Sequence, residues 1–125
     1  MAGAHAAHPS QQHATRASIS AVKAMRAEGR AADARASYAD LVARHQARAS
    51  RIAVHYLGDG VEADQAVQDA FVTAYTHLAS LPDDLPFEVW FVGILINGCL
   101  ARIRARSTVR VRLFHAMHRL LSASG

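Results

Sequence analysis

The chain has 125 residues, a formal net charge of +4 and 51% hydrophobic residues, many of them alanine and few of them aromatic. This length suits one domain with a single, thin helical core. One cysteine excludes an intramolecular disulfide, and no apolar run approaches the roughly 18 residues that span a bilayer, so we expect a cytoplasmic protein without a membrane partner.

Charged side chains are sorted along the sequence. Residues 1–58 hold eight basic and three acidic side chains, and residues 59–88 hold seven acids without any lysine or arginine. Residues 89–125 hold six arginines and no acid. Because ordinary surfaces mix both signs, this pattern predicts two surfaces, one for a basic partner and one for a polyanion.

The N-terminal part of the sequence is the least regular. Residues 1–16 show no apolar period, and Gly29 interrupts the helix-favouring composition that follows. We therefore expect residues 1–35 to be a mobile or loosely helical segment.

Apolar residues of helical period then predict the first strong helix, near residues 37–57, which Gly58 ends as a C-cap. Asp59 and Glu62 have the spacing of a capping box and open a second helix, near residues 61–79. One face of this second helix is apolar. The other face carries acidic, amide and hydroxyl side chains but no lysine or arginine.

A loop with the sequence SLPDDLPFE leads into a third predicted helix, near residues 86–106. Acidic side chains at its start and Arg102, Arg104 and Arg106 at its end complement the helix dipole. Residues 108–125 are predicted as a separate, short and basic amphipathic segment.

The resulting fold class is all-α: a small bundle of three main helices over residues 36–107. No strand pattern and no solenoid repeat appear in the sequence. A flexible N-terminus and a short C-terminal helix are expected to flank the bundle. The expected common core consists of Tyr38, Leu41, Ile52, Val67, Phe71, Tyr75, Trp90 and Ile94.

Two stretches, YLGDGVEADQAVQDAFVTAY and FEVWFVGILINGCLARIRAR, carry a recognisable pattern. Together they resemble region two of the extracytoplasmic-function sigma factors of bacterial RNA polymerase, over about residues 36–107. Gln65 and Ala101 stand where that family has aspartate, and Ile96 stands where a basic residue is common. The matching positions are Leu57, Gly58, Asp59, Ala63, Asp64, Gln68, Asp69, Phe71, Trp90, Ile94, Asn97 and Arg104.

The resemblance implies two binding surfaces. In that family the polar face of the second helix docks on a coiled coil of the polymerase β′ subunit. This assigns polymerase binding to Asp64, Gln68 and Asp69, which would form charge-assisted hydrogen bonds with basic groups of β′.

The third helix and the loop before it engage the separated strands of the promoter minus-ten element in that family. The loop, residues 81–87, is where the family holds an unstacked base. By this resemblance, the DNA-binding residues are Phe87, Asn97, Arg102, Arg104, Arg106 and Arg110.

Each feature also has a simpler explanation. A polar helix face is most often only solvated, although 30 residues without lysine or arginine argue against this. Asn97 could equally satisfy a backbone group of the core. The arginines could serve only the helix dipole, but six of them within residues 102–119 exceed that need and favour a polyanion.

The sequence shows no set of residues typical of an active site, such as a nucleophile with a base or a phosphate-binding glycine loop. We therefore expect that the protein is not an enzyme and has no cofactor. His5 with His8, and His115 with His118, stand three residues apart. No third and fourth ligand accompanies either pair at the spacing of a zinc site, so we expect no metal site.

Sigma factors of this group normally continue into region four, which reads the minus-thirty-five element. We expect either a fragment of a longer factor or a single-domain relative. Two functions stay open: a sigma-factor-like initiation protein that binds DNA, and a sigma mimic that binds an anti-sigma factor or other regulator without sequence-specific DNA binding. The arginine-rich end favours the initiation protein, and the missing region four favours the sigma mimic. A third alternative, a plain helical bundle without a polymerase role, applies if the motif matches are chance.

Overall fold

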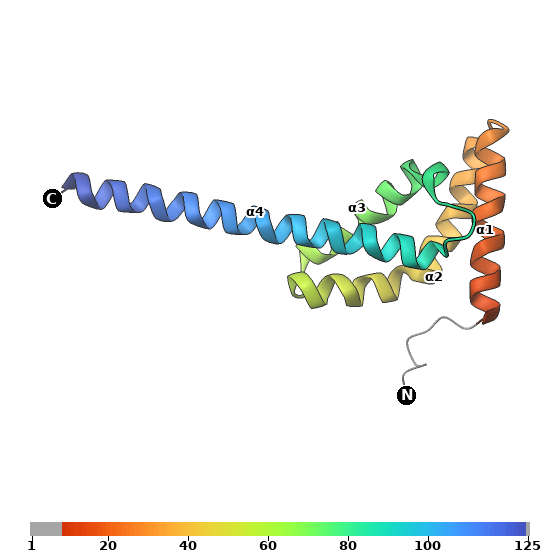
Figure 1. The fold of residues 1–125 in the computed structure, drawn as a ribbon, viewed down its shortest axis with the longest axis horizontal. Coiled ribbons are helices and arrows are strands. Elements are labelled where there is room, and N and C mark those ends of the chain that lie inside the picture. Colours follow the sequence, from red (N-terminus) through yellow and green to blue (C-terminus); the bar gives the residue numbers. More distant parts are fainter. Residues whose placement is uncertain (1–8, 125) are drawn as a thin grey trace.

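The computed structural model describes residues 9–124, which form helices and contain no strand. The helices are α1 (Pro9–Ala27), α2 (Ala31–Leu57), α3 (Val61–Thr76) and α4 (Phe87–Ser124), with the short 3-10 helix η2 (Leu78–Ser80) between α3 and α4. As Figure 1 shows, α1, α2, α3 and the first half of α4 pack together, and the second half of α4 extends away from them. The all-α prediction is confirmed.

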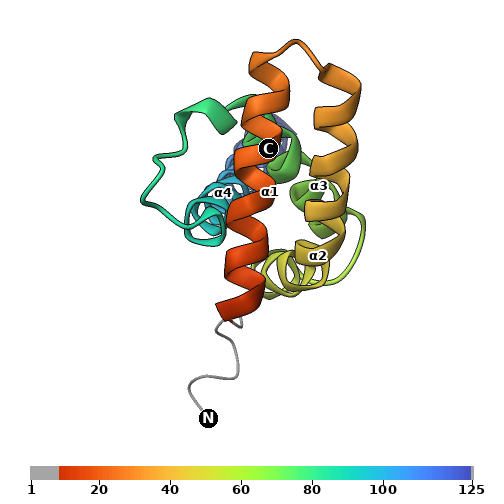
Figure 2. The same cartoon turned by 90° about the vertical axis from the view of Figure 1, so that its right-hand side faces the viewer.

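Helix α1 packs against the rest of the bundle and is not loosely attached to it. Its side chains Thr15, Ile19 and Val22 are buried. Figure 2 shows α1 beside the first half of α2, with the loop that precedes α4 on its other side. The segment that we expected to be mobile or loosely helical, residues 1–35, therefore contains a packed helix from residue 9 onward. Residues 1–8 lie outside the described residues.

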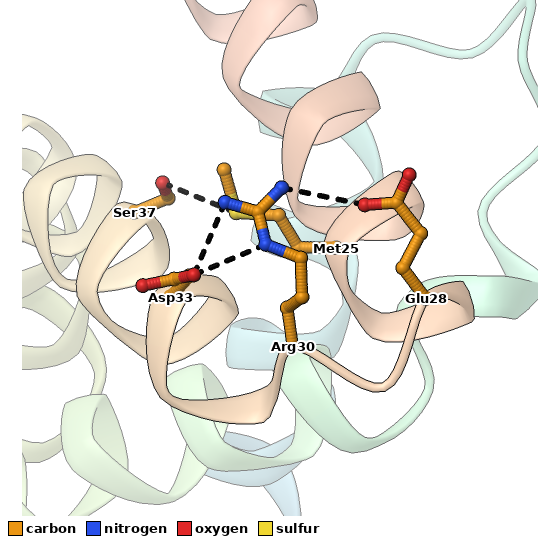
Figure 3. A network of polar contacts seen from close by, with 5 residues as sticks. All are labelled: Met25, Glu28, Arg30, Asp33 and Ser37. Atoms are coloured by element: carbon orange, nitrogen blue, oxygen red, sulfur yellow. Dashed lines mark hydrogen bonds and ion pairs between the residues drawn. The ribbon is translucent and has the colours of Figure 1, made fainter.

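A tight corner joins α1 to α2. Gly29 has φ 77, which is in the left-handed region that glycine adopts without strain, and it allows the chain to reverse. Arg30 donates hydrogen bonds to Asp33 at 3.1 Å and to Glu28 at 3.4 Å, as Figure 3 shows. The glycine that we expected to weaken one helix instead ends the first of two.

Half of the expected core residues have side chains that the structure buries. Tyr38, Leu41, Val67 and Phe71 are buried, and the Tyr38 hydroxyl donates to the Phe71 carbonyl at 2.6 Å. Burial raises the pKa of Tyr38, which keeps this hydroxyl protonated. The other four expected residues are half-buried and pack against the core: Ile52, Tyr75, Trp90 and Ile94.

The buried face of α4 agrees only in part with the helix side that the sequence predicts. That predicted side holds Phe87, Trp90, Phe91, Ile94, Asn97 and Ala101, and only its two phenylalanines are buried. The side chains that enter the core are Phe87, Phe91, Leu95 and Cys99, at regular steps of four residues. The Phe91 ring stacks on Phe71, with ring centroids 4.3 Å apart. This face is rotated from the expected one, so Asn97 points to solvent rather than into the core.

The C-terminal helical segment is continuous with α4, which has no break near residue 107. From residue 104 onward nearly every described side chain of α4 is exposed. No helix within residues 9–124 is both long enough and apolar enough to cross a membrane.

Candidate functional site

The polar face of α3 is a direct result of how the helix packs. Ala66, Val67, Ala70 and Phe71 are buried, so the side chains on the opposite side of the helix remain in solvent. The three predicted polymerase-binding residues are among them, and we call them the acidic face: Asp64, Gln68 and Asp69.

The arginines of α4 lie beside the acidic face. Arg102 Nη2 is 2.6 Å from Asp69 Oδ2, and Arg106 pairs with Glu62 while also donating to the Leu57 carbonyl at 3.1 Å. The Asp69 side chain is 72% exposed, so this contact is a surface ion pair with a stabilisation of about 0.2–1 kcal/mol. The structure thus pairs Asp69, which the sequence analysis assigned to polymerase binding, with Arg102, which it assigned to DNA binding.

Arg104 and Arg110 differ from these paired arginines. Both are exposed, and neither forms an ion pair with another residue of the part of the chain that the structure describes. Arg104 and Arg110 can therefore meet phosphate groups directly, whereas Arg102 and Arg106 would first have to leave Asp69 and Glu62.

Asn97 lies on the solvent face of α4, at the edge of a shallow groove between α3 and α4. Asp69 and Arg102 line the same groove. The position excludes the alternative in which Asn97 satisfies a backbone group inside the core.

An exposed stripe runs along α4 past Asn97. It begins at Val89 and continues through Gly93, Asn97 and Leu100 to Arg104, with steps of four, four, three and four residues. At 1.5 Å per residue, the stripe is about 22 Å long.

A pocket of about 450 Å³, which we call the loop pocket, lies at the N-terminal end of that stripe. The loop before α4 and Val89 form one side of it, and α1 forms the other. Phe87 is one of its lining residues, although only 4% of its surface is exposed. The predicted base-holding loop therefore contains a cavity, in which Phe87 contributes a wall rather than a protruding ring.

A chain of polar contacts lies beside the loop pocket. Thr15 Oγ1 is 3.2 Å from His45 Nε2, His45 Nδ1 is 3.2 Å from Glu88 Oε1, and Arg48 donates to Glu88 Oε2 at 3.2 Å. The pKa of His45 is lowered mainly because burial disfavours the charged imidazole, an effect that Glu88 partly opposes. In the neutral imidazole, Nδ1–H donates to Glu88 and Nε2 accepts from the Thr15 hydroxyl.

Thr15, His45 and Glu88 follow one another in the order of the nucleophile, base and acid of a catalytic triad. The Thr15 side chain is only 6% exposed, however, so a substrate could not reach its hydroxyl without rearrangement. The contacts instead join α1, α2 and α4 around the pocket. Sequence reasoning missed this arrangement, because its members are separated by 30 and 43 residues and no local pattern connects them. Within residues 9–124 no three His, Cys, Asp or Glu side chains could hold a metal ion together; His5 and His8 lie outside the described residues.

The lowered pKa of His45 predicts acid sensitivity. The unfolded chain binds a proton at His45 near the ordinary pKa of about 6.5, whereas the folded chain resists that proton, so the free energy of unfolding should fall as the pH drops below that value. Urea unfolding between pH 5 and 8 measures this. His45→Gln should flatten the dependence and His115→Gln, which removes an exposed imidazole, should not; equal slopes for both variants would contradict the prediction.

Comparison with known proteins now gives the family. The family model of Sigma-70 region 2 matches residues 41–109, from within α2 into the second half of α4 and over more than half of the chain. The chain therefore belongs to the Sigma-70 region 2 family, which confirms the resemblance. Domains of this family are transcription factor domains that bind the core of RNA polymerase and promoter DNA. A search of curated proteins gave no match.

Proposed function

We propose that this protein is a sigma-factor-like initiation protein of the bacterial cytoplasm. Its acidic face would bind the β′ coiled coil of RNA polymerase, and its α4 helix with the preceding loop would bind the separated minus-ten strand of the promoter. Family membership over residues 41–109 is the observation that carries this proposal.

The exposure of the acidic face supports the polymerase contact. Asp64 and Gln68 are open to solvent, so a basic partner reaches them without rearrangement of the helix. Asp69 pairs with Arg102 in the free domain, and a polymerase arginine would have to replace that contact. Because exposed ion pairs contribute little, this replacement costs about 1 kcal/mol or less.

The α4 stripe supports the DNA contact. It begins at the loop pocket, where a base could be held, and leads past Asn97 to Arg104. A single strand that follows this path would meet a base site at one end and exposed cations at the other, which is the combination that single-strand binding needs. Phe87 and Asn97 are the proposed base contacts, and the proposed phosphate contacts are Arg102, Arg104, Arg106 and Arg110.

If the protein binds DNA as proposed, its affinity for DNA should depend on salt, and Arg104 should account for part of that dependence. Affinity for a single-stranded minus-ten oligonucleotide should fall with salt at a log–log slope of about −0.7 per phosphate contacted. Arg104→Gln should reduce the slope by about one contact and weaken all sequences alike. Arg35→Gln, which removes an exposed arginine from α2, is the control of equal charge and should leave the slope unchanged.

The measurement is a titration of a labelled oligonucleotide and its scrambled copy at two salt concentrations. A clear preference for the minus-ten sequence supports the initiation protein, because base contacts specify and phosphate contacts only position. Equal and feeble binding to both oligonucleotides would reject DNA recognition.

One observation favours the second candidate, a sigma mimic that binds an anti-sigma factor. The second half of α4 exposes large apolar side chains that phosphate contacts would leave uncovered: Val109, Val111, Leu113, Phe114 and Met117. An apolar face of this kind on a basic helix suits an amphipathic protein partner. If both oligonucleotides bind equally and a helical regulator binds this half of α4, the mimic is the better description.

A further inference from the structure

We propose that α1, which lies outside the matched segment 41–109, completes the site for one unstacked base of the separated DNA strand. This inference rests on the proposed function and adds to it a second wall of the base site, with the residues that form it. The side chains that α1 contributes to the loop pocket are Gln12, Thr15, Arg16, Ile19, Ser20 and Lys23.

The size and position of the loop pocket are the first support. Its volume of about 450 Å³ is within the usual range of small-ligand sites, about 300–1,000 Å³. Figure 2 shows α1 between the first half of α2 and the loop. The side chains that line the cavity come from α1, from the loop with the start of α4, and from His45 of α2. Without α1, the six side chains that it contributes to the lining would be missing.

The chemistry of the lining is the second support. Ile19 from α1 faces a space that Leu85 and Phe87 also line, and such apolar groups suit the flat faces of a base. Hydrogen-bonding groups of Gln12 and Ser20 suit the polar edges of a base. Polar edges with apolar faces are what distinguish a nucleobase from a purely apolar ligand.

Charge is the third support. Arg16 of α1 lines the same pocket, where it can meet a phosphate next to a captured base, whereas Lys23 already contacts the loop. Asp83 and Glu88 also line it, but each is already close to a cation or an imidazole of this chain: Asp83 lies 3.6 Å from Lys23, and Glu88 pairs with Arg48 and His45.

Two side chains of α1, Lys23 and Arg26, fix it to the elements around the loop. Lys23 Nζ donates to the Leu81 carbonyl at 2.8 Å. Arg26 donates to the Tyr75 carbonyl and lies over the Tyr75 ring, 4.5 Å from its centroid. Because α1 holds both the start of the loop and the end of α3, its position determines the width of the pocket.

The test scans a minus-ten oligonucleotide with an abasic nucleotide at each position in turn. Binding to the full chain is measured by fluorescence anisotropy. We expect one position at which removal of the base weakens binding about tenfold, as loss of one stacked base should. At the other positions of the oligonucleotide, removal of the base should change the affinity much less.

Ser20→Trp fills the pocket from the α1 side, and Ala24→Trp places the same ring on an exposed site of α1 that does not line it. In Ser20→Trp the tenfold effect of the abasic position should disappear while the salt slope persists, because the arginines of α4 are untouched. Ala24→Trp should behave as the wild type does. Circular dichroism melting of both variants checks that each remains folded.

The outcomes separate this inference from the proposed function. If Ser20→Trp keeps the tenfold effect, α1 is not a wall of the base site and the inference is overturned, while sequence-preferring DNA binding stands. If the wild type prefers the minus-ten sequence but no single abasic position matters, the inference is also overturned. If the wild type binds the minus-ten and scrambled oligonucleotides equally, DNA recognition itself is rejected and the inference falls with it.

Discussion

Asp64→Lys combined with Asp69→Lys is expected to reduce binding to the β′ coiled coil at least 100-fold. Both carboxylates are exposed on α3, and reversing them places like charges against the basic partner, which costs several kcal/mol. The second substitution also removes the ion pair with Arg102, which contributes only about 0.2–1 kcal/mol to folding. Isothermal titration with a β′ coiled-coil fragment gives the affinity, and circular dichroism gives the helicity.

The control for this experiment is a pair of reversals with the same change of charge at other sites. Asp40→Lys with Asp84→Lys alters two exposed carboxylates, one on α2 and one in the loop before α4. We expect this variant to bind β′ nearly as the wild type does. Unchanged binding by the double variant at 64 and 69 would mean that the acidic face is only solvated.

Phe91→Ala is expected to lower the free energy of unfolding by about 3–5 kcal/mol. The Phe91 side chain is 3% exposed and stacks against both Phe71 and Phe87, so its removal leaves a cavity among aromatic rings. Trp90→Ala should cost less, because Trp90 is only half-buried. The sequence analysis included Trp90 in the expected common core, whereas the structure buries Phe91 more deeply than Trp90.

Urea unfolding followed by circular dichroism compares the two variants with the wild type. Trp90 is the only tryptophan, so its fluorescence adds a local measurement in Phe91→Ala. A larger loss of stability in Trp90→Ala than in Phe91→Ala would contradict the buried face that the structure gives to α4.

Helical periodicity was sufficient to predict α2 and α3 because each has apolar residues on one side only. The first turns of α4, by contrast, are apolar nearly all round, with the sequence FEVWFVGILI. Periodicity cannot choose a buried face in such a stretch, and the packing of Phe91 on Phe71 decides it instead. The same choice turns Asn97 outward.

The candidate site was predictable where it depends on residues close in sequence. The sorted charges indicated the acidic face and the arginines of α4. The participation of α1 could not be predicted, because Lys23 reaches Leu81 across 58 residues and Thr15 reaches His45 across 30. The pairing of Asp69 with Arg102 is also set by the packing of α3 on α4, which the sequence does not specify.

That pairing has a consequence for how the two proposed partners influence each other. Asp69, a proposed polymerase contact, pairs with Arg102, a proposed DNA contact. Arg106, another proposed DNA contact, pairs with Glu62, which lies on the same helix as the acidic face. A polymerase arginine that takes over Asp69 leaves Arg102 without its counter-charge and ready for a phosphate. By thermodynamic linkage the reverse holds equally, and DNA bound at Arg102 leaves Asp69 ready for polymerase. A pair of about 1 kcal/mol would make the two binding events cooperative by roughly fivefold, so the domain would capture a promoter strand more strongly on the enzyme than alone.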